Sequence, residues 1–246
     1  MNLKTVSLAS LCKGSLFVSL RLLCVFVVLL VRASVAADAP GTKPVRIMPV
    51  GDSITEGGKA FPTYRYPLAK KLADAGFKVE FVGSRQSDSP AGVLRHEGYG
   101  GKNAEFLATV IGKSFKEHPA DLVLIHSGHN HFIEEKPVDG IAAATEAMIK
   151  TVREINPRVT VLVAEVITSG KLPKYSYIPQ LNEALRKLAA RLDTPAQRVI
   201  AVNQAGGFDW KTDTIADMVH PNERGAEKMA ACWFEALKPL LEKSAK

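Results

Sequence analysis

Continuous apolar runs, separated by segments of helical periodicity, constrain the fold of this chain more than any other feature. Five runs of strand length occupy residues 45–50, 77–82, 122–126, 159–167 and 199–202. The runs are unbroken rather than alternating, which is typical of strands that are buried on both faces. Apolar residues recur at helical spacing over residues 64–75, 103–117, 138–155, 178–192 and 221–242.

Strands and helices that alternate in this order predict an α/β fold. At 246 residues and 46% hydrophobic composition, the chain is long enough to bury a full core. We expect a five-stranded parallel sheet with helices on both faces, which is a three-layer α/β/α sandwich. One folded domain over residues 45–246 accounts for all of the predicted elements.

The first 36 residues differ from the rest and predict a secretory signal peptide. Three basic residues precede the apolar run at 22–31, and small residues follow it as far as Ala36. An uncleaved membrane anchor is the alternative, but ten apolar residues are short for a span of about 20. We therefore expect cleavage near Ala36, a flexible lead over residues 37–44, and export to a periplasm or out of the cell.

Much of the basic character of the chain belongs to this segment. Loss of residues 1–36 removes four of the 32 basic residues and none of the 25 acidic ones, so the net charge falls from +7 to +3. The remaining chain has no basic cluster, and we expect no nucleic-acid partner. Cys232 remains as a single cysteine within an apolar helical pattern, so no intrachain disulfide is expected.

Polar sequences follow the end of each predicted strand. "GDSIT" follows the first strand, "HEGYGGKN" the second, "SGHNH" the third, "ITSGK" the fourth and "DMVHPN" the fifth. Ligands of parallel α/β sheets bind beyond the carboxyl ends of the strands. The polar side chains that could bind a ligand or take part in catalysis are therefore expected to gather at one edge of the sheet.

Ser53 is a candidate nucleophile at this edge, although a serine after a strand is commonly a helix cap. A serine hydroxyl becomes nucleophilic when a base removes its proton and a third group orients that base. His220 is the candidate base, and Asp217, three residues earlier, is placed to hold its other ring nitrogen. Pro221 suits the first position of the last helix and would fix His220 at the helix entrance.

Candidate donors for an oxyanion come from three segments. They are backbone N–H groups near Ser53, backbone N–H groups in the glycine-rich residues 98–101, and the side-chain amide of Asn130. Tight-turn roles for the glycines and an ordinary turn role for Asn130 are the alternatives.

Taken in chain order, "GDSIT", "GYGGK", "SGHNH" and "DMVHPNERG" resemble the four sequence blocks of the SGNH, or GDSL-type, hydrolases. The resemblance covers nearly all of residues 45–235. It implies a flavodoxin-like fold in which residues 45–246 form the catalytic domain. It also implies that Ser53 is the nucleophile, His220 the general base and Asp217 the partner that orients the base.

The same resemblance implies an oxyanion hole made by the backbone N–H groups of Ser53 and Gly101 and by the side chain of Asn130. Gly100 is adjacent to Gly101 and is the alternative donor. The chain departs from the family at His131, where an aspartate is usual. We expect activity to persist, with different hydrogen bonds around Asn130.

Longer stretches are similar to the acetylxylan-esterase-like carbohydrate esterases, namely "TYRYPLAKKLADAGFKVEFVGS", "HEGYGG" and "VHPNERGAEKMAACWFEAL". This similarity implies removal of O-acetyl groups from a carbohydrate, or hydrolysis of another small ester, through a covalent acyl-enzyme. It implies no cofactor, no metal and no stable membrane association after signal cleavage. Lysophospholipases, thioesterases and arylesterases of the same superfamily are the alternative, and a non-catalytic glycan-binding module is a further one.

Two aromatic residues are candidates for substrate binding. Trp210 is either a platform for a sugar ring or a side chain packed under its loop, and Tyr99 either lines the site or belongs to a turn. Arg65 and Glu97 match the related esterases at positions that brace the loops around the serine. Trp233 fits the buried face of the last helix.

Other enzyme classes are less consistent with the sequence. His126, His129 and His131 form an H-x-x-H-x-H pattern that suits zinc, but adjacent strand-end positions point in different directions and no carboxylate motif completes the site. Neither "GGKA" nor "GGKN" has the spacing of a phosphate-binding loop. The G-x-S-x-G motif of the α/β-hydrolases is absent.

Overall fold

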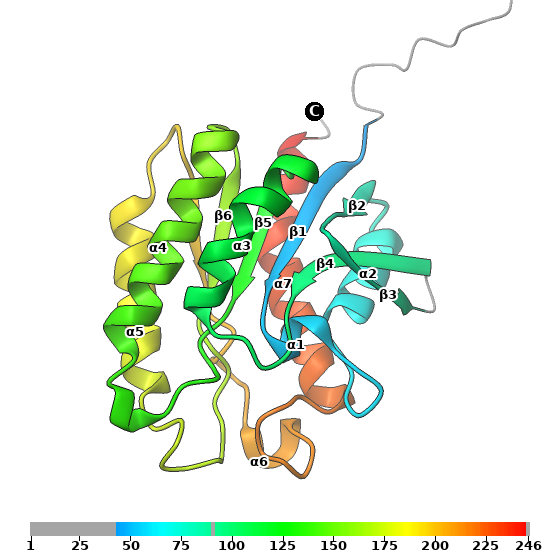
Figure 1. The fold of residues 1–246 in the computed structure, drawn as a ribbon. Coiled ribbons are helices and arrows are strands. Elements are labelled where there is room, and N and C mark those ends of the chain that lie inside the picture. The colour runs from blue at the N-terminus through cyan, green and yellow to red at the C-terminus, as the bar shows by residue number, and fades with distance from the viewer. Residues whose placement is uncertain (1–42, 90–91, 245–246) are drawn as a thin grey trace, which may run out of the picture. The chain divides into compact units, whose positions relative to one another are not determined.

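The computed structural model describes residues 43–89 and 92–244 (Figure 1). The predicted signal peptide, residues 1–36, lies outside the described residues, as does the predicted lead as far as residue 42. Within the described ranges, no helix is both long enough and apolar enough to cross a bilayer.

The five predicted strands form the parallel part of the central sheet. In spatial order they are β2 (Val79–Phe81), β1 (Val45–Gly51), β5 (Leu122–His126), β6 (Thr160–Ala164) and β7 (Val199–Val202). If these five strands are numbered by their order along the chain, their spatial order is 2-1-3-4-5, which is the flavodoxin-like arrangement. The direction in which the chain moves across the sheet reverses at β1. The predicted fold class is confirmed.

The sheet has seven strands rather than the predicted five. The additional strands are β3 (Arg85–Ser89) and β4 (Gly92–Gly98), which pair with each other antiparallel. The end of β4 then joins β1 in parallel at Val50 and Gly51, beyond the part of β1 that pairs with β2. Residues 85–98 are largely polar, so they lack the apolar run that marked the other strands.

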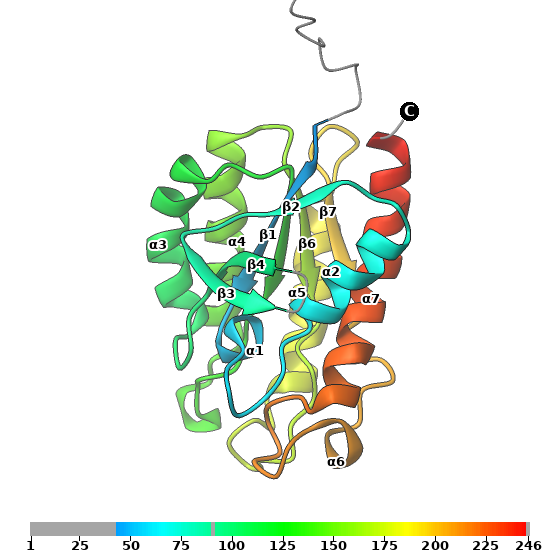
Figure 2. The same cartoon turned by 90° about the vertical axis from the view of Figure 1, so that its right-hand side faces the viewer.

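The five predicted helices are present and cover both faces of the sheet (Figure 2). They are α2 (Arg65–Asp74), α3 (Ala104–Glu117), α4 (Val138–Ile155), α5 (Ile178–Leu192) and α7 (Glu223–Ser244). Three short helical segments were not predicted: α1 (Ser53–Glu56), a 3-10 turn η1 (Ile133–Glu135) and α6 (Trp210–Asp213).

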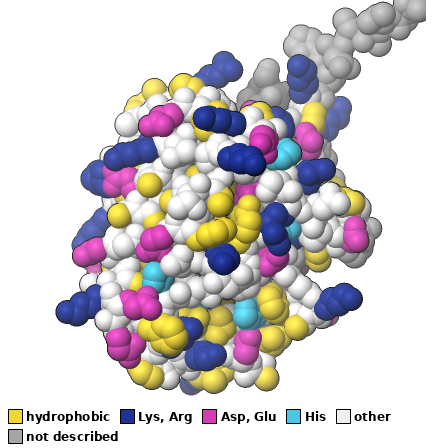
Figure 3. Space-filling view, viewed as in Figure 1, with side chains coloured by type: hydrophobic (Ala, Val, Ile, Leu, Met, Phe, Trp, Pro, Cys, Tyr) yellow, Lys and Arg dark blue, Asp and Glu magenta, His cyan; other side chains and the backbone are white. Residues whose placement is uncertain are grey.

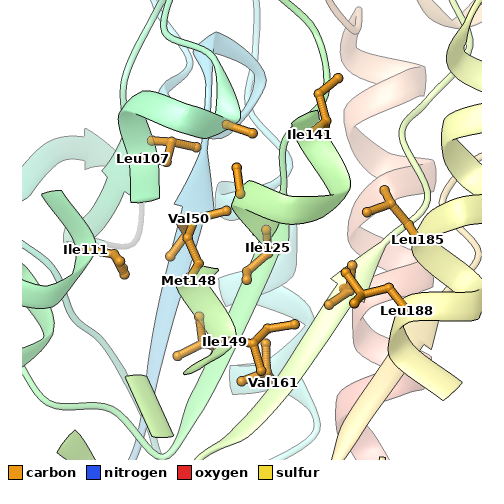
Figure 4. Close-up of a cluster of buried hydrophobic side chains, with 14 of the residues drawn as sticks. Val50, Leu107, Ile111, Ile125, Ile141, Met148, Ile149, Val161, Leu185 and Leu188 are labelled. Atoms are coloured by element: carbon orange, nitrogen blue, oxygen red, sulfur yellow. The ribbon is translucent and has the colours of Figure 1, made fainter. Parts of the chain in front are cut away.

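Two buried clusters of hydrophobic side chains hold the layers together. On one face, strand residues such as Val50 and Ile125 pack against α3, α4 and α5 (Figure 4). On the other face, strand residues such as Ile47 and Leu124 pack against α2 and α7, where Trp233 is fully buried as predicted. Both faces of the central strands are covered, which explains their unbroken apolar runs.

The prediction that Pro221 opens the last helix is wrong. Pro221 forms a short antiparallel bridge with Thr214, and α7 begins at Glu223. Asn222 caps the helix instead, because its Oδ1 accepts the N–H of Gly225 at 3.0 Å. Asparagine is a strong N-cap residue, so the start of the helix moves two positions along the chain.

Candidate active site

Ser53 is presented by a sharp turn from β1 into α1. Gly51 ends the strand so close to its neighbours that a Cβ there would lie under 3.0 Å from the carbonyl oxygen of His126. Asp52 then caps the helix, because its Oδ1 accepts the N–H of Ile54 at 3.0 Å. Ser53 is the first residue of α1 and is half-buried. The turn therefore projects its hydroxyl at the carboxyl edge of the sheet.

Three predicted residues meet at this hydroxyl. Ser53 Oγ lies 2.8 Å from His220 Nε2, across 167 positions of sequence, and His220 Nδ1 lies 2.5 Å from Asp217 Oδ2. Burial disfavours the charged form of Asp217, but hydrogen bonds from the His220 ring and from the backbone N–H groups of His220 and Val219 outweigh it. The pKa of Asp217 is therefore lowered, and its carboxylate is ionised at neutral pH.

The turn that carries Asp217 and His220 is held from the neighbouring loop. Met218 lies between them in the left-handed region, with φ 61°. Its carbonyl accepts the hydroxyl of Ser169 at 2.8 Å and the N–H of Gly170 at 2.9 Å. This loop follows β6, so the histidine turn is anchored to the sheet.

Phe61 also fixes the plane of the His220 ring, and sequence reasoning missed it. The two rings stack with their centroids 4.0 Å apart and an interplanar angle of 19°. Its only signal was that it is the one aromatic side chain in the loop over residues 57–63, which reads GGKAFPT.

The predicted oxyanion donors lie in loops that contact each other. Asn130, with φ 70°, directs its amide Nδ2 to the carbonyl of Lys102 at 2.9 Å, immediately after Gly101. The N–H of Gly100 donates to Glu56 Oε2 at 2.6 Å, whereas Gly101 has no such bond to any described residue. Of the two glycines, Gly101 is therefore the one whose N–H is available to a substrate.

Glu56 is a site residue that sequence reasoning missed. Its carboxylate binds the N–H of Gly100 and forms an ion pair with Arg85 of β3. Glu56 ends the short helix that starts with Ser53. The carboxylate thus fixes the glycine loop beside the serine.

Arg65 and Glu97 occupy the bracing positions predicted for them. The buried Arg65 guanidinium donates to the carbonyl oxygens of Thr55 and Glu56 at 2.7 and 2.9 Å, at the end of α1. Glu97 is also buried and accepts hydrogen bonds from the hydroxyl groups of Ser84, Tyr99 and Ser114.

The two aromatic candidates have different surroundings. The Tyr99 hydroxyl donates to Glu97 at 2.8 Å, and its ring packs edge-on against Phe106, so it belongs to the bracing network rather than beside Ser53. Trp210 opens α6 and lies against Gly170, where a Cβ would come under 3.0 Å from the indole ring. Part of its ring therefore packs against the loop that anchors the histidine turn, while the side chain stays half-exposed.

The three histidines of the H-x-x-H-x-H pattern lie in two separate environments. His126 and His129 are both buried, and burial lowers the pKa of both, to about 4 for His126. His131 instead places Nδ1 2.7 Å from Glu135 and Nε2 2.9 Å from Glu105. Among the residues that the structure covers, no three His, Cys, Asp or Glu side chains form a group suited to a metal ion.

Known proteins resemble this chain in sequence and in fold. The model of the GDSL-like lipase/acylhydrolase family matches residues 50–228. A multidomain esterase of Ruminococcus flavefaciens is 28% identical over 242 residues, which cover 85% of this chain and 30% of that protein. The chain thus spans less than a third of the length of this relative.

Two solved structures have the same fold over nearly their whole length. A family 3 carbohydrate esterase of Clostridium thermocellum is 28% identical with a TM-score of 0.73, over 83% of this chain and 100% of that one. A variant of an acetyl esterase, solved with an acetate ion, is 26% identical with a TM-score of 0.72, over 81% of this chain and 99% of that one.

Proposed function

The chain belongs to the GDSL-like lipase/acylhydrolase family, and we propose that it is an exported serine esterase that removes O-acetyl groups from a carbohydrate. One observation carries the proposal: Ser53 Oγ lies 2.8 Å from His220 Nε2, and Asp217 holds the other ring nitrogen. A free serine hydroxyl is a weak nucleophile, and these two hydrogen bonds form the arrangement that activates one.

In the first step, Ser53 Oγ attacks the carbonyl carbon of the acetyl ester while its proton passes to His220 Nε2. The resulting imidazolium keeps its Nδ1 proton and donates it in a hydrogen bond to Asp217, whose lowered pKa keeps the carboxylate charged. The stacked ring of Phe61 limits rotation of the imidazole during this transfer. The base is therefore oriented before the substrate arrives.

The tetrahedral intermediate carries a negative oxygen that needs donors. In our proposal these are the backbone N–H of Ser53 at the start of α1, the backbone N–H of Gly101 and the side-chain amide of Asn130. One amide hydrogen of Asn130 is directed to the Lys102 carbonyl, which leaves the other for the substrate.

His220 then returns its proton to the departing sugar oxygen, and the acetyl group stays on Ser53. In the second step His220 takes a proton from water, the hydroxide attacks the acyl-enzyme, and acetic acid leaves as the proton returns to Ser53 Oγ. Every proton that moves is carried by this histidine.

Two relatives support acetate and carbohydrate as the two halves of the substrate. One structural relative is a family 3 carbohydrate esterase, and another is an acetyl esterase whose structure holds an acetate ion. Both are more than 25% identical to this chain and match it over more than four-fifths of its length.

A longer acyl chain is the second candidate, and exposed apolar side chains favour it. Phe132, Leu172 and Met218 are exposed by 52%, 62% and 40%, and all three come from loops at the carboxyl edge of the sheet. Hydrophobic side chains also gather at this lower end in the space-filling view (Figure 3). Such a surface suits contact with a lipid or an acyl chain.

The test is hydrolysis of p-nitrophenyl acetate and p-nitrophenyl octanoate by the purified protein and by its Ser53→Ala variant. We expect acetate turnover far above octanoate turnover, and its loss to background in the variant. Ser244→Ala is the matched control, because this serine lies at the end of α7 and, among the described residues, its hydroxyl donates to the carbonyl of Leu240 alone.

Preference for octanoate would keep the serine mechanism and move the function to lipids or thioesters. Equal rates for the protein and for Ser53→Ala on both esters would contradict the mechanism itself.

Export rests on the sequence of residues 1–36. N-terminal sequencing of protein recovered from the periplasm or the medium should begin near residue 37. A protein that retains Met1 would contradict a cleaved signal peptide.

A further inference from the structure

A cavity of about 490 Å³ lies between the loop after β6 and the loop after β7. Its walls combine three aromatic side chains, Tyr175, Phe208 and Trp210, with polar ones that include Ser169, Ser176 and Asp209 and with aliphatic ones that include Leu172. The volume falls within the range of about 300–1,000 Å³ that is usual for small-molecule sites. Helix α6, which carries Trp210, lies at the same end of the sheet as α1 (Figures 1 and 2).

One wall of the cavity is bonded to the turn that holds Asp217 and His220. Ser169, which lines the cavity, donates its hydroxyl to the carbonyl of Met218 at 2.8 Å, and the adjacent Gly170 N–H donates to the same oxygen. Met218 lies between Asp217 and His220. A molecule in the cavity would therefore adjoin the acid and base of the site.

The opposite wall reaches the oxyanion side of the site. Tyr175 packs edge-on against His129, with ring centroids 5.1 Å apart. Burial raises the pKa of Tyr175, while a hydrogen bond from the backbone of Asn130 opposes the rise. Because His129 immediately precedes Asn130, Tyr175 packs beside the segment that carries our third oxyanion donor.

The mixture of groups in the walls fits a sugar ring better than an acyl chain. A pyranose has apolar C–H faces, which pack on aromatic rings, and a rim of hydroxyl groups, which need polar partners. Ser176 and Asp209 are exposed at the mouth of the cavity and offer such partners. An acyl chain would cover the same polar groups without bonding to them, which is unfavourable.

We propose that this cavity is a subsite for a neutral sugar ring adjacent to the acetylated position, with Trp210 and Tyr175 as its aromatic walls. The inference rests on the proposed esterase function and names the part of the substrate that this surface binds. Gly170 lies against the Trp210 ring and fixes it before any ligand arrives. A wall that is already ordered loses little side-chain entropy on binding.

The kinetic test compares esters with and without a sugar. The sugar esters are xylose tetraacetate and glucose pentaacetate, and the simple ester is p-nitrophenyl acetate. In Trp210→Ala, kcat/KM for both sugar esters should fall about tenfold or more, and kcat/KM for p-nitrophenyl acetate should stay within about twofold. Lys238→Ala is the control, because Lys238 is exposed on α7 and does not line the cavity.

A second variant keeps the test valid if loss of the indole disturbs the loop. Ser176 is exposed at the mouth, so Ser176→Phe should fold and partly fill the cavity. It should reduce sugar-ester hydrolysis selectively, as Trp210→Ala does. Equal losses on sugar esters and p-nitrophenyl acetate in both variants, or no loss on sugar esters in either, would overturn the subsite.

Selective loss of p-nitrophenyl octanoate hydrolysis would assign the cavity to an acyl chain. That result would also overturn the sugar subsite, but it would leave the serine esterase intact.

A binding measurement separates failure of the subsite from failure of the proposed function. The chain has two tryptophans, and Trp233 is fully buried in the core, so a ligand-dependent change in tryptophan fluorescence reports on Trp210. Titration of Ser53→Ala with xylotetraose should change the emission, and Trp210→Phe in the same background should abolish that change. If the parent protein has no esterase activity and Ser53→Ala still gives this change, the proposed function is contradicted and the subsite is supported. If xylotetraose causes no change in emission, the subsite is overturned.

Discussion

Asp52, the residue before the proposed nucleophile, is expected to destabilise the folded protein at neutral pH. Its side chain is fully buried, and its Oδ2 has no hydrogen-bond partner among the described residues. The nearest basic atom is His129 Nδ1 at 3.8 Å, but burial keeps the pKa of His129 well below its ordinary value. Burial accordingly raises the pKa of Asp52 from 3.8 to about 6.

The magnitude follows from the difference between these two values. An acid whose pKa is raised on folding binds its proton more tightly in the folded state, so its contribution to stability is greatest below about pH 4. That contribution is lost as the pH rises to about 6, and the free energy of unfolding stays lower above it. At about 1.4 kcal/mol per pH unit, ionisation of Asp52 costs about 3 kcal/mol at pH 7.5.

Asp52→Asn removes this cost and keeps the helix cap, because an asparagine Oδ1 also accepts the N–H of Ile54. The amide still buries one polar group, so we expect a gain of about 1–3 kcal/mol at pH 7.5. Turnover should fall by about three- to tenfold, since the negative charge of Asp52 favours the imidazolium form of His220. The variant therefore exchanges activity for stability.

Urea unfolding at pH 4, 5, 6 and 7.5 measures the effect. The stability difference between Asp52→Asn and the parent should be close to zero at pH 4 and reach its full value above about pH 6.5. Asp88→Asn, which changes an exposed carboxylate on β3, serves as the matched control. A difference that is the same at pH 4 and pH 7.5, or a loss of stability at both, would refute the reasoning.

Three further predictions concern the glycine loop, His131 and the metal alternative. In Gly100→Ala the added Cβ would lie under 3.0 Å from Glu56 Oε2, so kcat for p-nitrophenyl acetate should fall at least tenfold, with little change in KM or Tm. His131→Ala removes two hydrogen bonds to Glu105 and Glu135 and should lower the free energy of unfolding by about 1–3 kcal/mol in urea titrations; an unchanged value would show that the contacts contribute nothing. Dialysis against a chelator should leave the esterase rate unchanged, and a rate restored only by added zinc would revive the metal alternative.

The central strands were predictable because burial on both faces leaves a local signature. Residues 45–50 and 122–126 are unbroken apolar runs, and they became β1 and β5 within one residue of the predicted limits. The hairpin of β3 and β4 has no such signature. Its strands are partly exposed, and β4 joins the sheet only at Val50 and Gly51, through a contact about 47 residues away in sequence.

The candidate site divides in the same way. Ser53, Asp217 and His220 were predicted from the order of four sequence blocks at one edge of the sheet, because a serine after a strand is by itself commonly a helix cap. The structure brings the three side chains together. The choice between Gly100 and Gly101 depends on Glu56, which lies 44 positions from the glycine that it binds. No local pattern encodes a contact of that range.

The hairpin that the sequence concealed is also the element that completes the site. It pairs with β1 at Val50 and Gly51, beyond the residues that pair with β2, and delivers residues 98–101 to the serine because β4 ends where this loop begins. Gly98 lies so close to α1 that a Cβ would come under 3.0 Å from the backbone of Glu56. Arg85, from the other strand of the hairpin, holds the Glu56 carboxylate that binds the loop. Strand β4 thus sets the position of the loop over residues 98–101, and β3 holds Glu56, which binds that loop. The polar residue Arg85, which helped to hide β3 in the sequence, is the one that makes this contact.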